Sequence, residues 1–195
     1  MEIYLIRHTP TTAKEGVCYG QSDLALQEPF GEFFNNIKNT LAIDDYIVYS
    51  SPLIRCRQLA QHLSDGATIT FDDRLKEIDF GLWENETWDS IKKEDLNNWM
   101  NDFVNTGAPN GESFITLHKR VVNFIEELLL NHSEDKKIIL VSHAGVIRSM
   151  LAYLLAMPLT HAFKLPINFG SITKMKIYKD EAWNKLIYLN KETVA

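Results

Sequence analysis

Short apolar runs alternate with amphipathic segments along most of the chain, and this alternation limits the folds that the sequence can adopt. Short runs rich in β-branched and aromatic residues, bounded by turn residues, are typical of buried strands. Segments with apolar residues every three or four positions are typical of helices. Strands that alternate with helices predict an α/β fold, here a three-layer α/β/α sandwich with a mostly parallel central sheet.

The expected elements divide into a main domain and one insertion. We expect strands at residues 2–6, 46–49, 67–71 and 137–142, and a C-terminal hairpin at 171–178 and 182–189. We expect helices at residues 29–41, from Ser51 and Pro52 onward, at 112–131, and from 144 to about 156. Serine before proline is a strong helix start, with the serine as N-cap. The polar stretch with spaced aromatic residues predicts a small helical cap, at about residues 82–111, inserted in a single domain of residues 1–195.

Chemically active side chains follow three of the expected strands. Arg7 and His8 end the first strand, Arg55 lies in the first turn of the helix after the second, and His143 follows residues 137–142. Parallel strands bring their carboxyl ends to one edge of a sheet, where ligands bind in such folds. Two guanidinium groups can clamp a phosphate, and helix N-termini favour the same anion. The sequence therefore predicts an anion site at this edge.

The other histidines and both cysteines have ordinary interpretations. Four histidines show no spacing typical of zinc ligands and are expected on the surface or in packing: His62, His118, His132 and His161. Cys18 and Cys56 form neither a metal-ligand spacing nor a disulfide framework. Arg57 is expected on the surface. We therefore expect no metal and no cofactor.

The charge and the hydropathy pattern exclude two classes of partner. The formal net charge is −6, which argues against non-specific binding of nucleic acid. The N-terminus shows no basic and apolar leader, and no apolar run is long enough to cross a bilayer. We expect neither nucleic acid nor a membrane as partner, and a cytoplasmic location is the default.

Five short motifs occur in order across residues 3–148: Arg7-His8-Thr9, residues 51–58, residues 75–84, Gly111-Glu112-Ser113 and Ser142-His143-Ala144-Gly145. Each motif is weak alone, but together they resemble those of the histidine phosphatase superfamily, the phosphoglycerate-mutase-like proteins. Residues 18–23, after Arg-His-Thr rather than Arg-His-Gly, are most similar to the alpha-ribazole phosphatases of that family. Asn85 departs from the family pattern, which has glycine after the Trp-Glu pair.

The resemblance implies a phosphomonoester hydrolase in which His8 is the nucleophile and forms a phosphohistidine. Neutral imidazole is available near pH 7, which suits this role. Arg7 and Arg55 would hold the phosphoryl oxygens, as would His143, in a protonated state between anions. No metal is implied, because the arginines supply the positive charge.

The resemblance also implies a carboxyl group that protonates the leaving group and later deprotonates water. Glu77 matches by its motif position, with Asp79 and Glu84 as local competitors; Glu84 could instead brace the turn. One branch of the superfamily has a proton-donating aspartate where this chain has Ala144, which favours Glu77.

The implied substrate is alpha-ribazole 5'-phosphate or adenosylcobalamin 5'-phosphate, in cobalamin biosynthesis. The expected substrate contacts are Arg7, Arg55, His143, Ala144, Thr11, Lys14 and Gln21. Three cap tryptophans either stack on a planar base or form the core of the cap: Trp83, Trp88 and Trp99. The alternatives are a broad-specificity sugar-phosphate or nucleotide phosphatase, a phosphoglycerate mutase and a non-catalytic phospho-ligand binder. A homodimer is among the expected assembly states.

Overall fold

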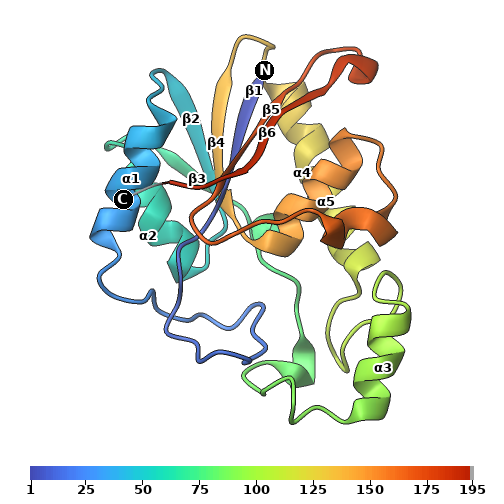
Figure 1. Ribbon diagram of the computed structural model, residues 1–195. Helices are drawn as coiled ribbons and strands as arrows, with labels where there is room; N and C mark the ends of the chain where they lie inside the picture. The colour runs from blue at the N-terminus through green and yellow to red at the C-terminus, as the bar shows by residue number, and fades with distance from the viewer. Residues whose placement is uncertain (194–195) are drawn as a thin grey trace.

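The computed structural model describes residues 1–193, which contain a six-stranded sheet with helices on both faces (Figure 1). The strands are β1 (Glu2–Arg7), β2 (Tyr46–Ser50), β3 (Ile69–Phe71), β4 (Lys137–Ser142), β5 (Ile172–Lys176) and β6 (Lys185–Lys191). The α-helices are α1 (Gly31–Leu41), α2 (Ile54–Leu63), α3 (Lys93–Asn101), α4 (Phe114–Asn131) and α5 (Ala144–Leu154). The predicted α/β fold is confirmed.

The sheet is mixed, with the parallel strands on one side and the antiparallel hairpin on the other. Its order is β3-β2-β4-β1-β5-β6. β1 and β2 both pair in parallel with β4, and β3 pairs in parallel with β2. β5 runs antiparallel to β1, and β6 antiparallel to β5. The carboxyl ends of β1, β2 and β4 therefore lie side by side.

Alternate side chains of the central strands pack against different helix layers. In β1, Ile3 and Leu5 belong to the core that contains α4 and α5, whereas Tyr4 and Ile6 belong to the core that contains α1 and α2. A strand points successive side chains to opposite faces, so an apolar run without alternation fits a strand covered on both sides. The three layers follow directly from this burial (Figure 1).

Helix α2 begins two residues later than the sequence predicts. Ser51 does not act as its N-cap: the N-cap position is Leu53, whose backbone is extended. The Ser51 hydroxyl lies 2.8 Å from Nε2 of His143, on another strand end. The Ser51 hydroxyl thus bonds to His143 instead of capping the helix.

The other differences at element ends are small. The expected helices at 29–41 and 112–131 begin at Gly31 and Phe114, the expected strand at 67–71 begins at Ile69, and α5 ends at Leu154. Ser113 caps α4, with its hydroxyl accepting a hydrogen bond from the backbone N–H of Thr116 at 3.4 Å.

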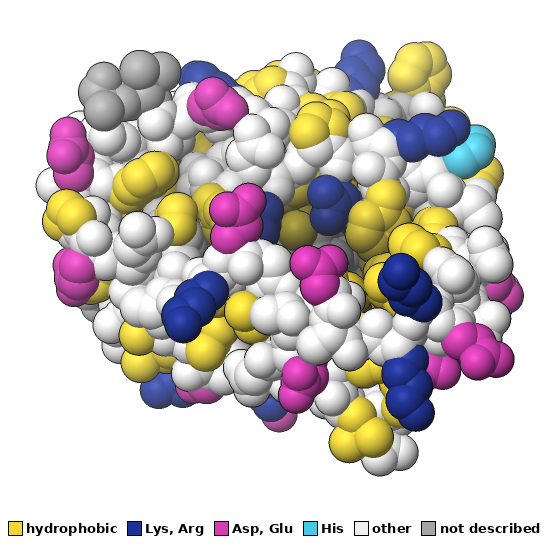
Figure 2. All heavy atoms as spheres, turned by 60° about the horizontal axis from the view of Figure 1, so that its bottom comes forward, with side chains coloured by type: hydrophobic (Ala, Val, Ile, Leu, Met, Phe, Trp, Pro, Cys, Tyr) yellow, Lys and Arg dark blue, Asp and Glu magenta, His cyan; other side chains and the backbone are white. Residues whose placement is uncertain are grey.

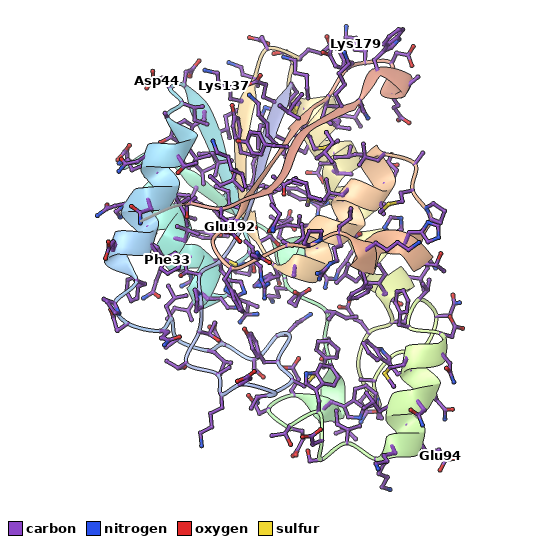
Figure 3. All side chains as sticks on the ribbon, viewed as in Figure 1. Phe33, Asp44, Glu94, Lys137, Lys179 and Glu192 are labelled. Atoms are coloured by element: carbon purple, nitrogen blue, oxygen red, sulfur yellow. The ribbon has the colours of Figure 1, made fainter. Side chains whose placement is uncertain are left out.

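Residues 82–111, the predicted cap, share a small apolar core with the loop that contains Cys18. Its buried members are Cys18, Trp83, Ile91 and Ala108. Figure 1 shows α3 below the sheet, beyond the carboxyl ends of the parallel strands, and in Figure 3 Glu94 points away from the sheet. Lys137, which starts β4, lies at the opposite end of the molecule (Figure 3). No helix within residues 1–193 is long and apolar enough to span a membrane.

Candidate active site

The ends of β1 and β4 place two imidazole rings beside each other. Arg7 pairs with Ser142 at the last position of the two strands, and the backbone N–H of His8 donates to the Ser142 carbonyl at 3.1 Å. His8 and His143 therefore leave adjacent strands at the same level. Their ring centroids are 5.2 Å apart. Both residues are buried.

One backbone carbonyl fixes the tautomer of His8. Nδ1 of His8 lies 2.7 Å from the carbonyl oxygen of Thr9. A carbonyl only accepts hydrogen bonds, so Nδ1 carries the proton and Nε2 of the neutral ring has a free lone pair. Burial, with the nearby charges of Arg55 and Arg7, holds the pKa of His8 well below its ordinary value. His8 is thus a neutral imidazole with a nucleophilic nitrogen.

Arg7 is held against the segment that precedes β5. Its guanidinium lies 3.6 Å from the ring centroid of Phe169, and Nη1 donates to the carbonyl of Ile167 at 2.6 Å. Its Nε is buried and makes no hydrogen bond within the described residues. The side chain is therefore fixed by two contacts and keeps a donor available.

Arg55 is a fully buried cation without a carboxylate partner in an ion pair among the described residues. It lies in the first turn of α2, donates from Nη1 to the carbonyl of Ser22 at 2.8 Å, and donates from Nη2 to the carbonyl of Gly20. Its Nε is buried with no hydrogen bond in the described residues, as in Arg7. Burying an unpaired charge is costly. Two guanidiniums that each keep a buried Nε without a partner in the described residues indicate an anion-binding site.

His143 is the N-cap residue of α5 and is held by the end of β2. Its Nε2 lies 2.8 Å from the Ser51 hydroxyl and 3.5 Å from Sγ of Cys56. Burial and the charge of Arg55 are the largest of the causes that hold its pKa well below the ordinary value. The lowered pKa favours a neutral ring, and the protonated state between anions stays a prediction. His143 lies beside the strand end as predicted.

Glu77 reaches the same edge from the loop that follows β3. Its Oε2 accepts a hydrogen bond from the backbone N–H of Gly145 at 3.1 Å, and its Oε1 accepts one from Ile78 at 3.0 Å. A Cβ at position 145 would lie 2.3 Å from Oε1 of Glu77. Glycine at this position is thus a condition for the observed carboxylate position.

Arg120 on α4 holds the backbone on which Glu77 sits. Its guanidinium forms an ion pair with Glu112 at 2.8 Å. It also donates at 2.7 to 2.9 Å to the carbonyl oxygens of residues 74, 76 and 77. Arg120 has no motif of its own in the sequence; the only signal was the Gly-Glu-Ser motif that contains its partner.

A pocket of about 240 Å³ opens over these groups. It is lined by Arg7, His8, Val17, Cys18, Tyr19, Arg55, Glu77, Trp88 and Phe169. Figure 2 shows a hollow with Lys or Arg side chains beside hydrophobic ones on the face formed by this end of the molecule. Four of the five residues predicted as catalytic line this pocket, and His143 lies directly behind His8.

The other predicted contacts lie outside the lining of this pocket. Thr11 is buried and accepts a hydrogen bond from the N–H of Ala13, and Lys14 is exposed. Gln21 donates its side-chain amide to the carbonyl of Glu77 at 3.1 Å, and Ala144 starts α5. These four residues keep their substrate roles only as predictions.

The two competitors of Glu77 are occupied by backbone amides. Asp79 accepts from the N–H of Gly81 at 2.8 Å. Glu84 accepts hydrogen bonds from the backbone N–H groups of Gly20, Gln21, Ser22 and Phe80, and from the Ser22 hydroxyl. It therefore braces the loop, which was the alternative role expected from the sequence. Neither carboxylate lines the pocket.

The aromatic residues divide between the cap and the pocket. Trp83 and Trp99 pack in the core of the cap, while Trp88 stacks on Trp99 and also lines the pocket. Tyr19 and Phe169 line the pocket and were missed, because their loops show no periodicity from which a side-chain direction could be predicted. Within residues 1–193, no group of three His, Cys, Asp or Glu side chains is arranged to hold a metal ion.

Comparison with known proteins supports the family suggested by these motifs. The chain is 32% identical to adenosylcobalamin/alpha-ribazole phosphatase of Escherichia coli over 81% of each chain. It is 27% identical to phosphoserine phosphatase 1 of Hydrogenobacter thermophilus, over 74% of this chain and 69% of that one.

Solved structures agree with this match. The crystal structure of alpha-ribazole phosphatase from Shigella flexneri superposes with a TM-score of 0.88 at 25% identity, covering 100% of this chain and 98% of that chain. The family model of the histidine phosphatase superfamily (branch 1) matches residues 3–190. With its two histidines, two arginines and one glutamate at the carboxyl edge of the sheet, the chain belongs to the histidine phosphatase superfamily, branch 1.

Proposed function

We propose that the protein hydrolyses phosphomonoesters through a phosphohistidine formed on His8. The observation that carries this proposal is the state of His8: it is neutral, its tautomer is fixed, and its free Nε2 belongs to a pocket that also contains Arg7 and Arg55. A neutral imidazole can attack phosphorus, and two guanidiniums can hold the phosphoryl oxygens and stabilise their charge in the transition state.

The first step transfers the phosphoryl group to the protein. The lone pair of His8 Nε2 forms a bond to phosphorus, and the bond to the leaving oxygen breaks with its electron pair moving to that oxygen. Glu77, in its protonated form, gives its proton to the leaving oxygen. The donors at Arg7, Arg55 and the ring of His143 hold the phosphoryl oxygens during the transfer.

The second step regenerates the enzyme. Water attacks phosphorus while the carboxylate of Glu77 takes its proton, and the bond from phosphorus to Nε2 breaks with its electron pair returning to the ring. Inorganic phosphate leaves. The positive charge that the reaction needs comes from the arginines, so the proposal includes no metal and no cofactor.

For the substrate, we infer alpha-ribazole 5'-phosphate or adenosylcobalamin 5'-phosphate, which would place the enzyme in cobalamin biosynthesis. Tyr19, Trp88 and Phe169 line the pocket with Val17, and an aromatic lining of this kind suits a leaving group with a planar base. Relatives named as alpha-ribazole phosphatases cover most or all of the chain. The predicted cytoplasmic location and homodimer rest on the sequence and stay predictions.

Phosphoserine is the second candidate, because a relative is named as a phosphoserine phosphatase. Its leaving group carries a carboxylate, which needs a cation beyond those that bind the phosphate. Among the described residues that line the pocket, the cations are Arg7 and Arg55. The lining therefore favours the planar, uncharged leaving group.

A mutase acting on a bisphosphate is not favoured either, because Lys92 and Lys93 are the cations that the sequence provides in the cap, residues 82–111.

The test of the mechanism is hydrolysis of p-nitrophenyl phosphate in the presence of EDTA. We expect the wild type to be fully active and His8→Ala to be inactive, with no acid-labile phosphoprotein after rapid quenching. His161→Ala, which changes an exposed histidine, is the matched control and should keep full activity. Full activity in His8→Ala contradicts the mechanism, and activity that EDTA removes and a divalent cation restores contradicts metal independence.

The test of the substrate is kcat/KM for alpha-ribazole 5'-phosphate against phosphoserine, 3-phosphoglycerate and a panel of sugar phosphates. We expect the ribazole to be preferred, and Trp88→Ala to reduce its kcat/KM more than that of phosphoserine. Equal kcat/KM values across the panel would support a broad-specificity phosphatase. A higher kcat/KM for phosphoserine would favour the second candidate.

A further inference from the structure

Glu84 is a half-buried carboxylate that the proposed reaction does not use, yet it gathers an unusual number of donors. Its two oxygens accept from the backbone N–H groups of Gly20, Gln21 and Ser22 at 2.9 to 3.0 Å, and from the Ser22 hydroxyl. The N–H of Phe80 adds a further bond at 3.1 Å. A carboxylate that accepts this many bonds fixes the loop of residues 20–22 to the cap.

The opposite face of the same loop holds Arg55. A peptide unit points its N–H and C=O in opposite directions, so a loop whose N–H groups converge on one side presents carbonyls on the other. The carbonyls of Gly20 and Ser22 both accept from the Arg55 guanidinium, which leaves Nε and the second N–H of each terminal nitrogen as further donors. The loop thus lies between an anion on one side and a cation on the other.

Two further observations show how closely this arrangement is packed. A Cβ at Gly20 would lie 1.8 Å from the carbonyl oxygen of Ile78 and 2.7 Å from Oε1 of Glu84. Asn85, with a φ of 67°, donates its side-chain amide to the Ser22 hydroxyl at 3.0 Å. The loop has little freedom to compensate for a change at Glu84.

We propose that Glu84 is a positioning residue that orients Arg55 for the phosphoryl group through the peptide units of residues 20–22. The proposal rests on the phosphatase function proposed above. Without the carboxylate, the loop carbonyls rotate or separate, and Arg55 loses the two carbonyl contacts that hold its guanidinium at the pocket. Glu84 thereby links the cap to the affinity of the site for phosphate.

The test is the inhibition constant of inorganic phosphate against p-nitrophenyl phosphate in Glu84→Gln. Glutamine has the same shape, but its NH₂ group faces the N–H of Ser22, so part of the network must open. One charge-assisted hydrogen bond at Arg55 corresponds to about a tenfold or larger rise in the inhibition constant and in KM. The matched control is Glu86→Gln, an exposed carboxylate in the same segment, which should leave both constants unchanged.

A double-mutant cycle separates positioning from a general loss of structure. Arg55→Lys keeps the charge but cannot bond two carbonyls and a phosphate in one plane. If Glu84 acts through Arg55, Glu84→Gln should have little additional effect on the phosphate inhibition constant in the Arg55→Lys background. Equal effects in both backgrounds, or a wild-type inhibition constant in Glu84→Gln despite lower stability, overturn the proposal.

A milder variant covers the case in which Glu84→Gln does not fold. Ser22→Ala removes the hydroxyl donor and leaves the carboxylate in place, so a smaller rise in the phosphate inhibition constant is expected, and none is expected if the network is only structural. Failure of this inference is distinct from failure of the proposed function. In the first case the enzyme remains an active, His8-dependent phosphatase; in the second, no such activity exists.

Discussion

At the residue scale, reactivity in this site depends on groups that do not react themselves. The Thr9 carbonyl decides which nitrogen of His8 carries the proton, and the Ser51 hydroxyl occupies Nε2 of His143. Nε2 of His8 is therefore free at the pocket, whereas Nε2 of His143 is hydrogen-bonded behind it, although both residues follow buried parallel strands. This difference supports His8 as the nucleophile.

Gly145 provides a direct test of the position of Glu77. In Gly145→Ala the new Cβ would lie 2.3 Å from Oε1 of Glu77, so the carboxylate, which ends a flexible side chain, must move. We expect the protein to fold and kcat/KM for an alkyl phosphate such as glycerol 2-phosphate to fall by about 100-fold. The fall for p-nitrophenyl phosphate should be smaller, because its leaving group departs without a proton.

The matched control for this substitution is Gly31→Ala. Gly31 is the first residue of α1, and a Cβ there meets no atom within 4 Å. We expect wild-type kinetics and up to about 1 kcal/mol of added stability. Equal losses with both substrates in Gly145→Ala would argue against Glu77 as the proton donor.

The residues that the sequence predicted well are those fixed by strand ends. Arg7 and His8 directly follow a strand, so the sheet dictates where they lie. Glu84 and Arg120 could not be assigned in the same way, because their roles depend on which backbone groups their side chains meet across loops. Lys14 was predicted to contact the substrate from its position in the loop after the first strand, but its side chain is exposed and does not line the pocket.

At the scale of elements, burial made the strands predictable and tertiary contacts moved the helix ends. β4 is buried at five of its six positions, which agrees with the buried strand that its apolar run predicts. The start of α2 had a strong local signal at Ser51, yet that hydroxyl is used by His143. Capping rules describe an isolated helix end, and a site built at that end can override them.

The loop that carries Glu77 is held by α4 through Arg120. In Arg120→Met the ion pair with half-buried Glu112 and three hydrogen bonds to the loop are lost. Removing one partner of such a pair leaves a desolvated charge, so we expect the free energy of unfolding to fall by about 2–4 kcal/mol. We also expect kcat to fall, because Glu77 moves with its backbone.

Urea unfolding and steady-state kinetics check this prediction. Lys119→Met changes the neighbouring exposed cation on α4 and should leave both quantities close to wild type. A loss of stability in Arg120→Met with unchanged kcat would mean that Glu77 is positioned by its contact with Gly145 alone.

At the scale of the whole molecule, an acidic protein keeps a positive site by burying it. The formal net charge is −6, yet the pocket contains two guanidiniums, one of which is fully buried. Low exposure to solvent and salt preserves their field, whereas the surface carboxylates are screened. Burial, together with the same field, lowers the pKa values of both site histidines.

Burial and this field make the stability of the molecule depend on pH in a defined window. The pKa values of buried His8 and His143 are well below their ordinary value, while in the unfolded chain histidine has a pKa of about 6.5. Below pH 6.5 the unfolded chain binds protons that the folded protein does not, so the free energy of unfolding falls as the pH is lowered. Each histidine contributes up to about 1.4 kcal/mol per pH unit.

Urea unfolding between pH 7 and pH 5 measures this slope. His8→Asn and His143→Asn should each reduce it, and the part that remains includes His62, His118 and the N-terminal amine of Met1, whose pKa values burial also lowers. Val121→Ala, a buried change in α4 without a titratable group, should lower stability equally at every pH. The depressed pKa of Glu84 acts below the ordinary range for glutamate, outside this window. An unchanged slope in both histidine variants would show that the folded site does not lower the pKa of either ring, which contradicts the expected pH dependence.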